Sequence, residues 1–339
     1  MPKILFDIYH LPQFNFLKNA ILAFEPDEVD VFCVNRGRLR QVVEHELPNY
    51  KVTCIGDYKY NKGPYSMLFR IILPRLYRLY RMVNPKKYRY VLTAHYQANV
   101  VAKLRRIPNI AFSDDPRKYV FPILKASADE VYLPPFQDKH RGVKVFNALK
   151  EWAYLSPRYF NPDPEILKAF DLDVKQYIFV REVSTETSNY LHQQKDIILS
   201  VAKEFPASWS VVLSLENKGN RDKYPDHWLI LEEPVPDIHS LMYFSQVVLS
   251  SGDSMAREGA ILGVPSIYAG QRDMPANQIM IDKGALVKVN TEEIVNTMQG
   301  IIDLEIMNFD QLEFRDKLTH EWDDITRLIL NKVRENAIA

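Results

Sequence analysis

One stretch of the chain decides the fold, and it reads Val247-Val248-Leu249-Ser250-Ser251-Gly252-Asp253-Ser254-Met255-Ala256-Arg257-Glu258-Gly259-Ala260-Ile261-Leu262-Gly263-Val264-Pro265. An apolar run typical of a buried parallel strand passes into small residues, and a helical pattern begins at once. The amides at the start of a helix carry partial positive charge and bind phosphate. The stretch therefore predicts a strand, a turn and a helix that together hold the phosphates of a nucleotide-sugar-like ligand.

The turn itself supplies candidate binding residues. Ser251, Gly252 and Ser254 are small enough to let a diphosphate approach the backbone, and the two hydroxyls can donate to it. Asp253 would repel a phosphate, so we expect its carboxylate to cap the helix. Glu258, one turn into the helix, is expected to accept hydrogen bonds from ribose hydroxyls. A Gly-Asp-Ser turn with a purely structural role remains an open alternative.

Apolar runs alternate with helical patterns along the first half of the chain. The expected strands are 3–8, 29–34, 51–55, 90–94, 109–112 and 130–133, and the expected helices are 14–24, 38–46, 65–83 and 97–105. Pro74 is expected to kink or split the helix over 65–83. Strands that alternate with helices predict a parallel sheet covered on both faces.

The same pattern restarts after Pro157, Pro162 and Pro164, which are typical of a domain boundary. The expected strands are 177–180, 210–215, 228–231, 247–250, 265–268 and 286–289, and the expected helices are 192–204, 238–244, 254–262, 276–283, 292–304 and 309–336. A length of 339 residues suits two domains. We therefore predict an N-terminal domain over 1–155, a C-terminal domain over 156–308 and a final helical segment over 309–339, with the ligand between the domains.

The net charge of the chain is zero, but the charge is unevenly distributed. Residues 1–160 hold 26 Lys and Arg against 14 Asp and Glu, whereas residues 161–339 hold 17 against 29. Tyr58–Ser113 contains no acidic residue at all. Such asymmetry indicates that the first half meets something anionic, although a basic face balanced by the other domain would give the same count.

The composition of the chain also indicates its cellular compartment. No apolar run approaches the roughly 20 residues that span a bilayer, and the N-terminus lacks the pattern of a signal peptide. Cys33 and Cys54 show no metal-ligand spacing and cannot form a disulfide framework. We therefore expect a cytoplasmic protein without a metal site.

The basic segment Pro64–Arg89 interleaves seven Lys and Arg residues with aromatic residues. Basic amphipathic helices with aromatic flanks bind anionic membrane surfaces, so we expect peripheral contact with the inner face of the membrane. A solvated helix face is the alternative. Nucleic acid is disfavoured as a partner because the chain carries no recognisable nucleic-acid motif.

Further candidates follow the ends of expected strands, where open α/β sheets bind their ligands. His10 is a candidate general base on an acceptor hydroxyl, and Asp114, next to Asp115, is a candidate acid or base. The alternatives are a histidine that hydrogen-bonds a loop and a turn initiated by Asp-Pro. His95 follows the expected strand 90–94 and is a further candidate. Arg272 follows strand 265–268, and its side chain would either reach the sugar donor or lie in solvent.

Four stretches of the chain resemble one known family. They are Lys3-Ile4-Leu5-Phe6-Asp7-Ile8 with His10 and Phe16-Leu17-Lys18-Asn19; Lys150-Glu151-Trp152-Ala153-Tyr154-Leu155 with Pro157, Tyr159, Phe160 and Pro162; Val180-Arg181-Glu182-Val183-Ser184; and the stretch quoted first. The resemblance is to the microbial family called domain of unknown function 354. This family lies within the superfamily of GT-B glycosyltransferases and UDP-N-acetylglucosamine 2-epimerases.

The resemblance implies a GT-B fold, in which two Rossmann-like, doubly wound α/β domains face each other across a cleft. The nucleotide-sugar site would lie on the C-terminal domain, and the final helix would cross back to the N-terminal domain. It implies that Ser251 to Met255 hold the phosphates, that Glu258 binds the ribose, and that Arg181 is a phosphate cation.

Two departures from the superfamily narrow the chemistry. The epimerases place a His-Arg pair after the first strand of the C-terminal domain, whereas this chain has Val180-Arg181, which argues against that epimerisation. The lipid-linked N-acetylglucosaminyltransferases begin with a glycine-rich loop, but residues 7–13 contain no glycine. An acceptor diphosphate bound as in those enzymes is therefore not expected.

These observations together predict a glycosyltransferase that uses a nucleotide-diphosphate sugar in surface polysaccharide or glycolipid synthesis. The acceptor would be lipid-linked or a saccharide, and no cofactor is expected, because helix amides and basic side chains can stabilise the leaving diphosphate. Two alternatives stay open. One is a UDP-sugar epimerase or hydrolase of the same superfamily, and the other is a catalytically silent GT-B binding protein.

Overall fold

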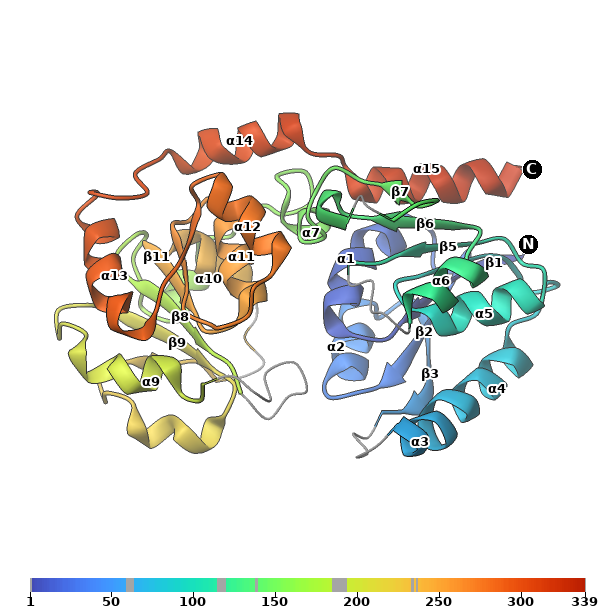
Figure 1. Ribbon diagram of the computed structural model, residues 1–339, viewed down its shortest axis with the longest axis horizontal. Helices are drawn as coiled ribbons and strands as arrows, with labels where there is room; N and C mark the ends of the chain where they lie inside the picture. The colour runs from blue at the N-terminus through green and yellow to red at the C-terminus, as the bar shows by residue number, and fades with distance from the viewer. Residues whose placement is uncertain are drawn as a thin grey trace. The chain divides into compact units, whose positions relative to one another are not determined.

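The computed structural model describes residues 2–58, 64–114, 120–137, 140–184, 194–232, 235 and 237–338. The chain divides into two compact units (Figure 1). Unit 1 comprises Met1–Tyr154 and Trp322–Ala339, and unit 2 comprises Leu155–Glu321. Each unit is an α/β domain built on one sheet.

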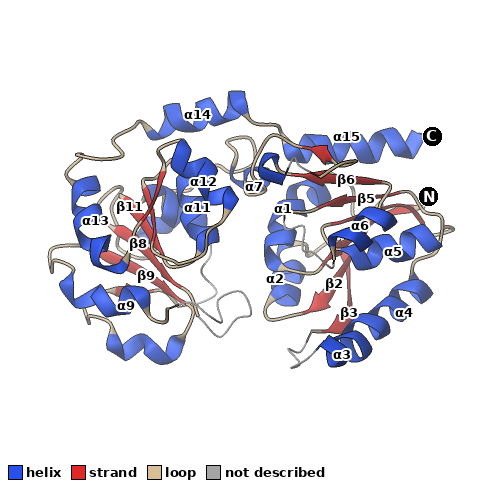
Figure 2. Cartoon of the chain, in the orientation of Figure 1, coloured by secondary structure: helices blue, strands red, loops and turns tan. Residues whose placement is uncertain are grey.

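Unit 1 contains a sheet in which every neighbouring pair of strands is parallel. Its strands are β1 (Lys3–Ile8), β2 (Val29–Asn35), β3 (Lys51–Asp57), β4 (Tyr88–Thr93), β5 (Asn109–Phe112), β6 (Glu130–Leu133) and β7 (Lys144–Val145). Its helices are α1 (Leu11–Leu22), α2 (Leu39–Glu46), α3 (Pro64–Met67), α4 (Leu73–Met82), α5 (Tyr96–Leu104), α6 (Phe121–Ser127) and α15 (Ile325–Ile338), while α7 (Trp152–Leu155) ends the first segment. Helices cover both faces of the sheet (Figure 2).

Unit 2 repeats this plan with a second parallel sheet. Its strands are β8 (Ile178–Glu182), β9 (Val211–Leu215), β10 (Leu229–Ile230), β11 (Val247–Ser250), β12 (Ser266–Tyr268) and β13 (Leu286–Lys288). Its helices are α8 (Glu165–Lys168), α9 (Ile197–Val201), α10 (Ile238–Phe244), α11 (Asp253–Ile261), α12 (Pro275–Asp282), α13 (Ile294–Ile302) and α14 (Gln311–Glu321). The expected helix 192–204 is thus represented by α9, and residues 192–193 lie outside the described residues.

Both sheets wind in the same way. The strand order is β3-β2-β1-β4-β5-β6-β7 in unit 1 and β10-β9-β8-β11-β12-β13 in unit 2. The direction of winding reverses between β1 and β4 in the first sheet and between β8 and β11 in the second. This is the order of a Rossmann sheet, so the prediction of two Rossmann-like domains is confirmed. Ligands of such sheets bind where the order reverses, at the carboxyl ends of the strands.

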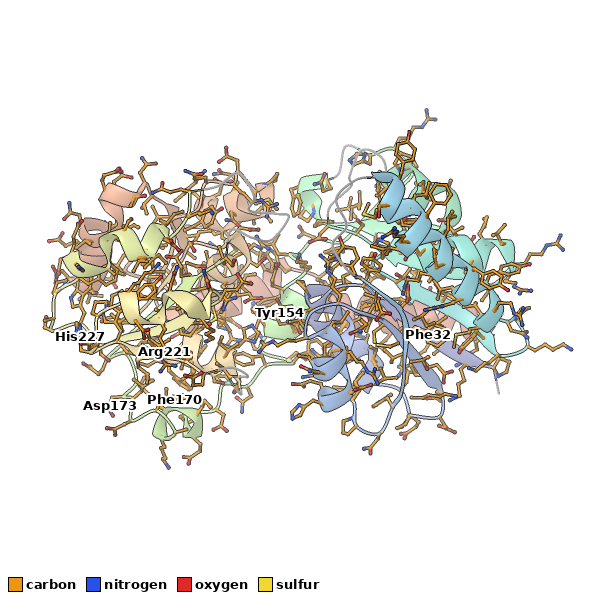
Figure 3. All side chains as sticks on the ribbon, turned by 90° about the horizontal axis from the view of Figure 1, so that it is seen from below. Phe32, Tyr154, Phe170, Asp173, Arg221 and His227 are labelled. Atoms are coloured by element: carbon orange, nitrogen blue, oxygen red, sulfur yellow. The ribbon has the colours of Figure 1, made fainter. Side chains whose placement is uncertain are left out.

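Each sheet lies within its own apolar core. In unit 1, Phe32 of β2, labelled in Figure 3, is buried. Its ring packs edge-on against Tyr88 of β4, with ring centroids 6.0 Å apart. In unit 2, Phe205 packs against Trp228 with centroids 5.1 Å apart. The central strands of both sheets, such as β1, β2, β9 and β11, are buried on both faces, which is why they appear in the sequence as mainly apolar runs.

The expected helix over 65–83 is divided just before Pro74, as predicted: α3 ends at Met67 and α4 begins at Leu73. A π-helical turn over Leu68–Ile72 joins α3 to α4, and in it the amide of Leu73 donates to the carbonyl of Leu68, five residues earlier. Pro74 is the second residue of α4, and proline is tolerated in the first turn of an α-helix because the first amides have no partner within that helix. The wider turn therefore takes up the change of register that the proline would otherwise force.

The expected single helix over 309–336 is two helices, and this prediction was wrong. The chain leaves α14 at Trp322, where the amide of Asp323 donates to the carbonyl of Asn147 at 3.0 Å. The Asp324 carboxylate then accepts from the amide of Arg327 at 2.9 Å and starts α15. As a result α14 belongs to unit 2, whereas α15 packs on α1 and β4 of unit 1. None of the described helices has the length and apolar character to cross a bilayer.

Candidate functional site

The candidate site lies in unit 2, where α11 begins just beyond the carboxyl end of β11. Gly252 is the cap residue of α11 and has an extended backbone, and its carbonyl accepts the amide of Ala256 at 3.3 Å. Within the described part of the chain, no acceptor forms a hydrogen bond with the backbone amide of Ser254 or of Met255. These two donors therefore point out of the helix N-terminus at the place where the winding of the sheet reverses.

The two serines that precede the helix build the turn. The Ser250 hydroxyl accepts from the amide of Gly252 at 3.0 Å and donates to the carbonyl of Gly252 at 2.8 Å. The amide of Ser251 donates to the carbonyl of Arg181, and the Ser251 hydroxyl accepts from the amide of Val183 at 2.9 Å. Ser251 is therefore buried and joins the ends of β8 and β11, while Ser254 is half-buried at the helix start. The expected contact of Ser251 with phosphate stays a prediction.

Asp253 does not cap the helix, so that expectation was wrong. Gly252 occupies the cap position, and Asp253 is the first helical residue. The Asp253 carboxylate is buried between two guanidinium groups: it accepts from Arg272 at 3.1 Å and lies 3.8 Å from Arg257. The negative charge that looked unfavourable beside a phosphate is thus balanced by two cations.

Arg272 is brought to the helix start by the loop that follows β12. Its amide donates to the Tyr268 hydroxyl at 3.1 Å, and its side chain is 31% exposed. The same loop passes very close to the turn, because a Cβ atom built on Gly270 would lie 2.4 Å from the carbonyl oxygen of Ser251. Arg272 is therefore a partly exposed cation held beside the open amides of α11.

Glu258 has a partner that the sequence did not reveal. Its carboxylate is mostly buried and lies 3.4 Å from the Nε2 atom of His239, which belongs to α10. The His239 ring stands edge-on to Phe160, with centroids 6.2 Å apart. This contact joins two consecutive helices across β11, between residues 19 positions apart, so the spacing within one helix could not have indicated it.

Arg181 and Glu182 end β8 on the other side of the reversal point. The Arg181 guanidinium donates to the Ser214 hydroxyl at 2.8 Å and lies 3.6 Å from Glu216, so it is directed toward the end of β9. The buried Glu182 carboxylate accepts from the amides of Ile198 and Leu199 at 2.8 and 3.1 Å. Burial raises the pKa of Glu182, against the opposing effect of these hydrogen bonds. Sequence reasoning assigned no role to Glu182, which holds the start of α9.

The raised pKa of Glu182 predicts a dependence of stability on pH. The folded protein holds this proton more tightly than the unfolded chain does, so its contribution to the unfolding free energy falls as pH rises from about 4.3 through the raised pKa. Glu182→Gln keeps an acceptor for both amides and has no proton to lose. Denaturant melts from pH 4 to neutral pH should therefore show the variant gaining stability relative to the wild type as pH rises. A constant difference between the two proteins would contradict the assignment.

The candidate residues of unit 1 each make contacts of their own. His10 follows β1 at the start of α1, and Arg36 donates to its Nε2 atom at 2.7 Å. Next to it the rings of Tyr9 and His95 stack at 4.0 Å, which places the ends of β1 and β4 side by side. Asp114 follows β5 and forms an ion pair with Lys150. Asp115 lies outside the described residues, and the roles of His10 and Asp114 stay predictions.

Comparison with solved structures identifies proteins of similar fold. The chain is similar to a UDP-GlcNAc 2-epimerase from Neisseria meningitidis bound to UDP-GlcNAc, at 17% identity with a TM-score of 0.65, covering 98% of this chain and 100% of that one. It is similar to the S. aureus MnaA–UDP structure (14%, TM-score 0.67, 99% and 96%) and to the glycosyltransferase SnogD from Streptomyces nogalater (12%, TM-score 0.65, 99% and 100%). Identities this low show the fold alone, which is the GT-B fold.

Comparison of sequences identifies the family. An uncharacterized protein of Methanocaldococcus jannaschii is 24% identical over 330 residues, covering 88% of this chain and 93% of that protein. The model of one family, described as protein of unknown function (DUF354), matches residues 2–338. The chain therefore belongs to the DUF354 family.

Proposed function

We propose that the protein binds a nucleotide-diphosphate sugar at the start of α11 and transfers the sugar to an acceptor. The observation that carries this proposal is the pair of open amides at Ser254 and Met255, beside the partly exposed guanidinium of Arg272. Backbone donors and a cation at a helix N-terminus are the chemistry that a diphosphate requires. They lie where the order of a Rossmann sheet reverses, which is where such sheets bind ligands.

In this reaction an acceptor hydroxyl attacks the anomeric carbon, and the bond from that carbon to the diphosphate breaks. The diphosphate leaves with the bonding electrons, and the amides of α11 together with Arg272 stabilise its new charge. Asp253 holds Arg272 in position before the ligand arrives. Arg181 is a second candidate cation, and to reach a phosphate it has to leave Ser214 and Glu216.

His10, in unit 1, is the proposed general base that takes the proton of the acceptor hydroxyl. In the structure its Nε2 lone pair accepts from Arg36, so Arg36 has to release this nitrogen before it can accept a proton. Asp114, paired with Lys150, is the second proposed acid or base of unit 1. The acceptor belongs to a surface polysaccharide or a glycolipid in this proposal.

The proposal favours transfer over epimerisation of the nucleotide sugar. The solved structures that the chain resembles include both UDP-GlcNAc 2-epimerases and glycosyltransferases, so the fold alone supports either reaction. At the end of β8 this chain has Arg181 followed by the buried Glu182, without the histidine of the epimerase pattern. NMR of a nucleotide sugar incubated with the protein and no acceptor separates the two reactions, because only an epimerase or hydrolase would convert it.

Glu258→Ala is expected to weaken nucleotide binding at least tenfold, because Glu258 is the proposed acceptor for the ribose hydroxyls. A thermal-shift screen of nucleoside diphosphates first identifies the base, since a ligand that binds only the folded protein raises Tm. Calorimetry with that nucleotide then compares the wild type with the variant.

Glu313→Ala is the matched control, because Glu313 is an exposed glutamate on α14 of the same unit. It should leave the dissociation constant unchanged. Equal affinity of the wild type and the Glu258 variant would show that Glu258 does not bind the ribose. The donor site would then have to be placed elsewhere.

A further inference from the structure

The helical segment 64–83 of unit 1 has an inner face that the fold buries and an outer apolar face that it leaves exposed. The inner face consists of Ile71, Arg75, Leu79 and Val83, which recur every four residues and are buried against the unit. Leu73 and Tyr77 lie two residues away from members of this row, which is a rotation of about 200° around an α-helix. They therefore lie on the side of the helix that faces away from the sheet.

This outer face is aromatic and exposed. Tyr65, Phe69, Leu73 and Tyr77, here called the aromatic ridge, recur every four residues, and Tyr65, Phe69 and Tyr77 are 79%, 63% and 62% exposed. Half of the large apolar side chains that the described residues expose lie between positions 65 and 82. Single exposed apolar residues are ordinary, but a cluster of this kind marks a surface that contacts a partner.

The charge around the aromatic ridge has one sign. Arg70, Arg78, Arg81 and Lys86 are exposed, and no acidic residue occurs anywhere in Tyr58–Ser113. The two other cations of the segment that have charged partners, Arg75 and Lys87, pair with Asp7 and Asp30 in the fold. These four exposed cations therefore have no carboxylate from residues 58–113 to neutralise them.

A second helix extends the same surface. The Arg105 guanidinium, at the end of α5, lies 3.8 Å from the centre of the Tyr80 ring and donates to the carbonyl of Tyr80 at 2.7 Å. Leu104, beside it, is 68% exposed, and Arg106 is exposed as well. The surface thus spans α4 and the end of α5, and the packing of Arg105 on Tyr80 fixes the two helices to each other.

We propose that the aromatic ridge and its surrounding cations dock unit 1 onto the surface of an anionic lipid bilayer. Aromatic side chains with a polar tip and Arg or Lys side chains are the residues that settle at the boundary between headgroups and acyl chains. The aliphatic residues of this surface, such as Leu73 and Leu104, favour a bilayer over a nucleic acid, because bases stack on aromatic rings and gain little from aliphatic chains. None of these residues belongs to the site at α11, so docking and sugar binding succeed or fail separately.

Flotation of the full-length protein with vesicles tests the proposal. Vesicles of phosphatidylcholine with phosphatidylglycerol should carry the protein, vesicles of phosphatidylcholine alone should not, and high salt should release it. Each exposed cation near an anionic surface strengthens binding roughly fivefold, so R70Q/R78Q/R81Q should reduce the partition coefficient on the order of 100-fold. F69S/Y77S should reduce it while leaving the net charge unchanged.

The control variant removes the same charge from other exposed sites, as K51Q/K203Q/K317Q, and should bind vesicles as the wild type does. Circular dichroism melts confirm that all variants fold, since the altered side chains are exposed. Equal partition of the wild type and both surface variants overturns the proposal. So does a dimer that F69S/Y77S abolishes without any vesicle binding, or binding to a single-stranded oligonucleotide but not to vesicles.

Discussion

Arg75→Met is expected to lower the unfolding free energy of unit 1 by about 3–5 kcal/mol, because it leaves a buried carboxylate without its counter-charge. The Arg75 guanidinium is buried and donates to Asp7 at 2.5 Å, to Gln97 at 2.7 Å and to the carbonyl of Ile55 at 3.0 Å. These contacts join α4 to β1, α5 and β3. Within the described residues, Arg75 donates to one carboxylate oxygen of Asp7 and no hydrogen bond reaches the other.

Hydrogen exchange in denaturant measures this loss unit by unit, since peptides from β1 and β4 report on unit 1 and peptides from β8 and β11 on unit 2. Arg40→Met is the matched control, because Arg40 is an exposed arginine whose pair with Glu44 lies on the surface of α2. That variant should lose about 0.5 kcal/mol or less. Asp7→Asn combined with Arg75→Met should cost less than the sum of the two single changes. A loss for Arg75→Met no larger than that of the control would show that the buried pair does not hold unit 1 together.

Gly270→Ala is expected to destabilise unit 2 by about 1–3 kcal/mol and to displace the loop that carries Arg272. The added Cβ would lie 2.4 Å from the carbonyl oxygen of Ser251 and 2.5 Å from the Tyr268 ring. A backbone carbonyl cannot move aside as a flexible side chain can, so the loop itself has to move. Because the loop holds Arg272 beside the start of α11, binding of a nucleoside diphosphate should weaken together with stability.

Gly300→Ala is the control for this change. A Cβ on Gly300 of α13 would meet its nearest neighbour, Ile306, at 3.5 Å, which is an ordinary contact. Alanine inside a helix should leave stability unchanged or raise it by up to about 1 kcal/mol. Denaturant melts of the two variants give the comparison. If Gly270→Ala melts like Gly300→Ala, the loop does not pass as close to the turn as the geometry indicates.

The fold could be predicted from sequence because its signals are local. Strands such as β1 and β11 are mainly apolar runs, and the helices of each unit show their own periodicity. The start of α11 was predicted to within a residue, since small residues between a strand and a helix mark it. The break between α14 and α15 could not be predicted in this way, because Asp323 leaves the helix to bond with Asn147, far away in sequence.

Only the part of the candidate site that lies in one continuous segment could be predicted from the sequence. Residues 251–258 are contiguous, and the turn and helix place them together. The partners of these residues come from elsewhere: His239 meets Glu258 from α10, and Arg272 meets Asp253 from the loop after β12. The function of Asp253 was mistaken for the same reason, since an aspartate at a helix start resembles a cap until the two arginines are known.

The return of α15 to unit 1 has a consequence for the order in which the protein can be completed during synthesis. Ile325, Ile329 and Val333 are buried, and Thr326 donates to the carbonyl of Ala153 at 3.2 Å, so unit 1 is completed only after all of unit 2 has been translated. Unit 2 is continuous and can fold as soon as Glu321 has emerged. The nascent chain can therefore complete unit 2 before unit 1, and until α15 has emerged the apolar surface that it covers is open to chaperones.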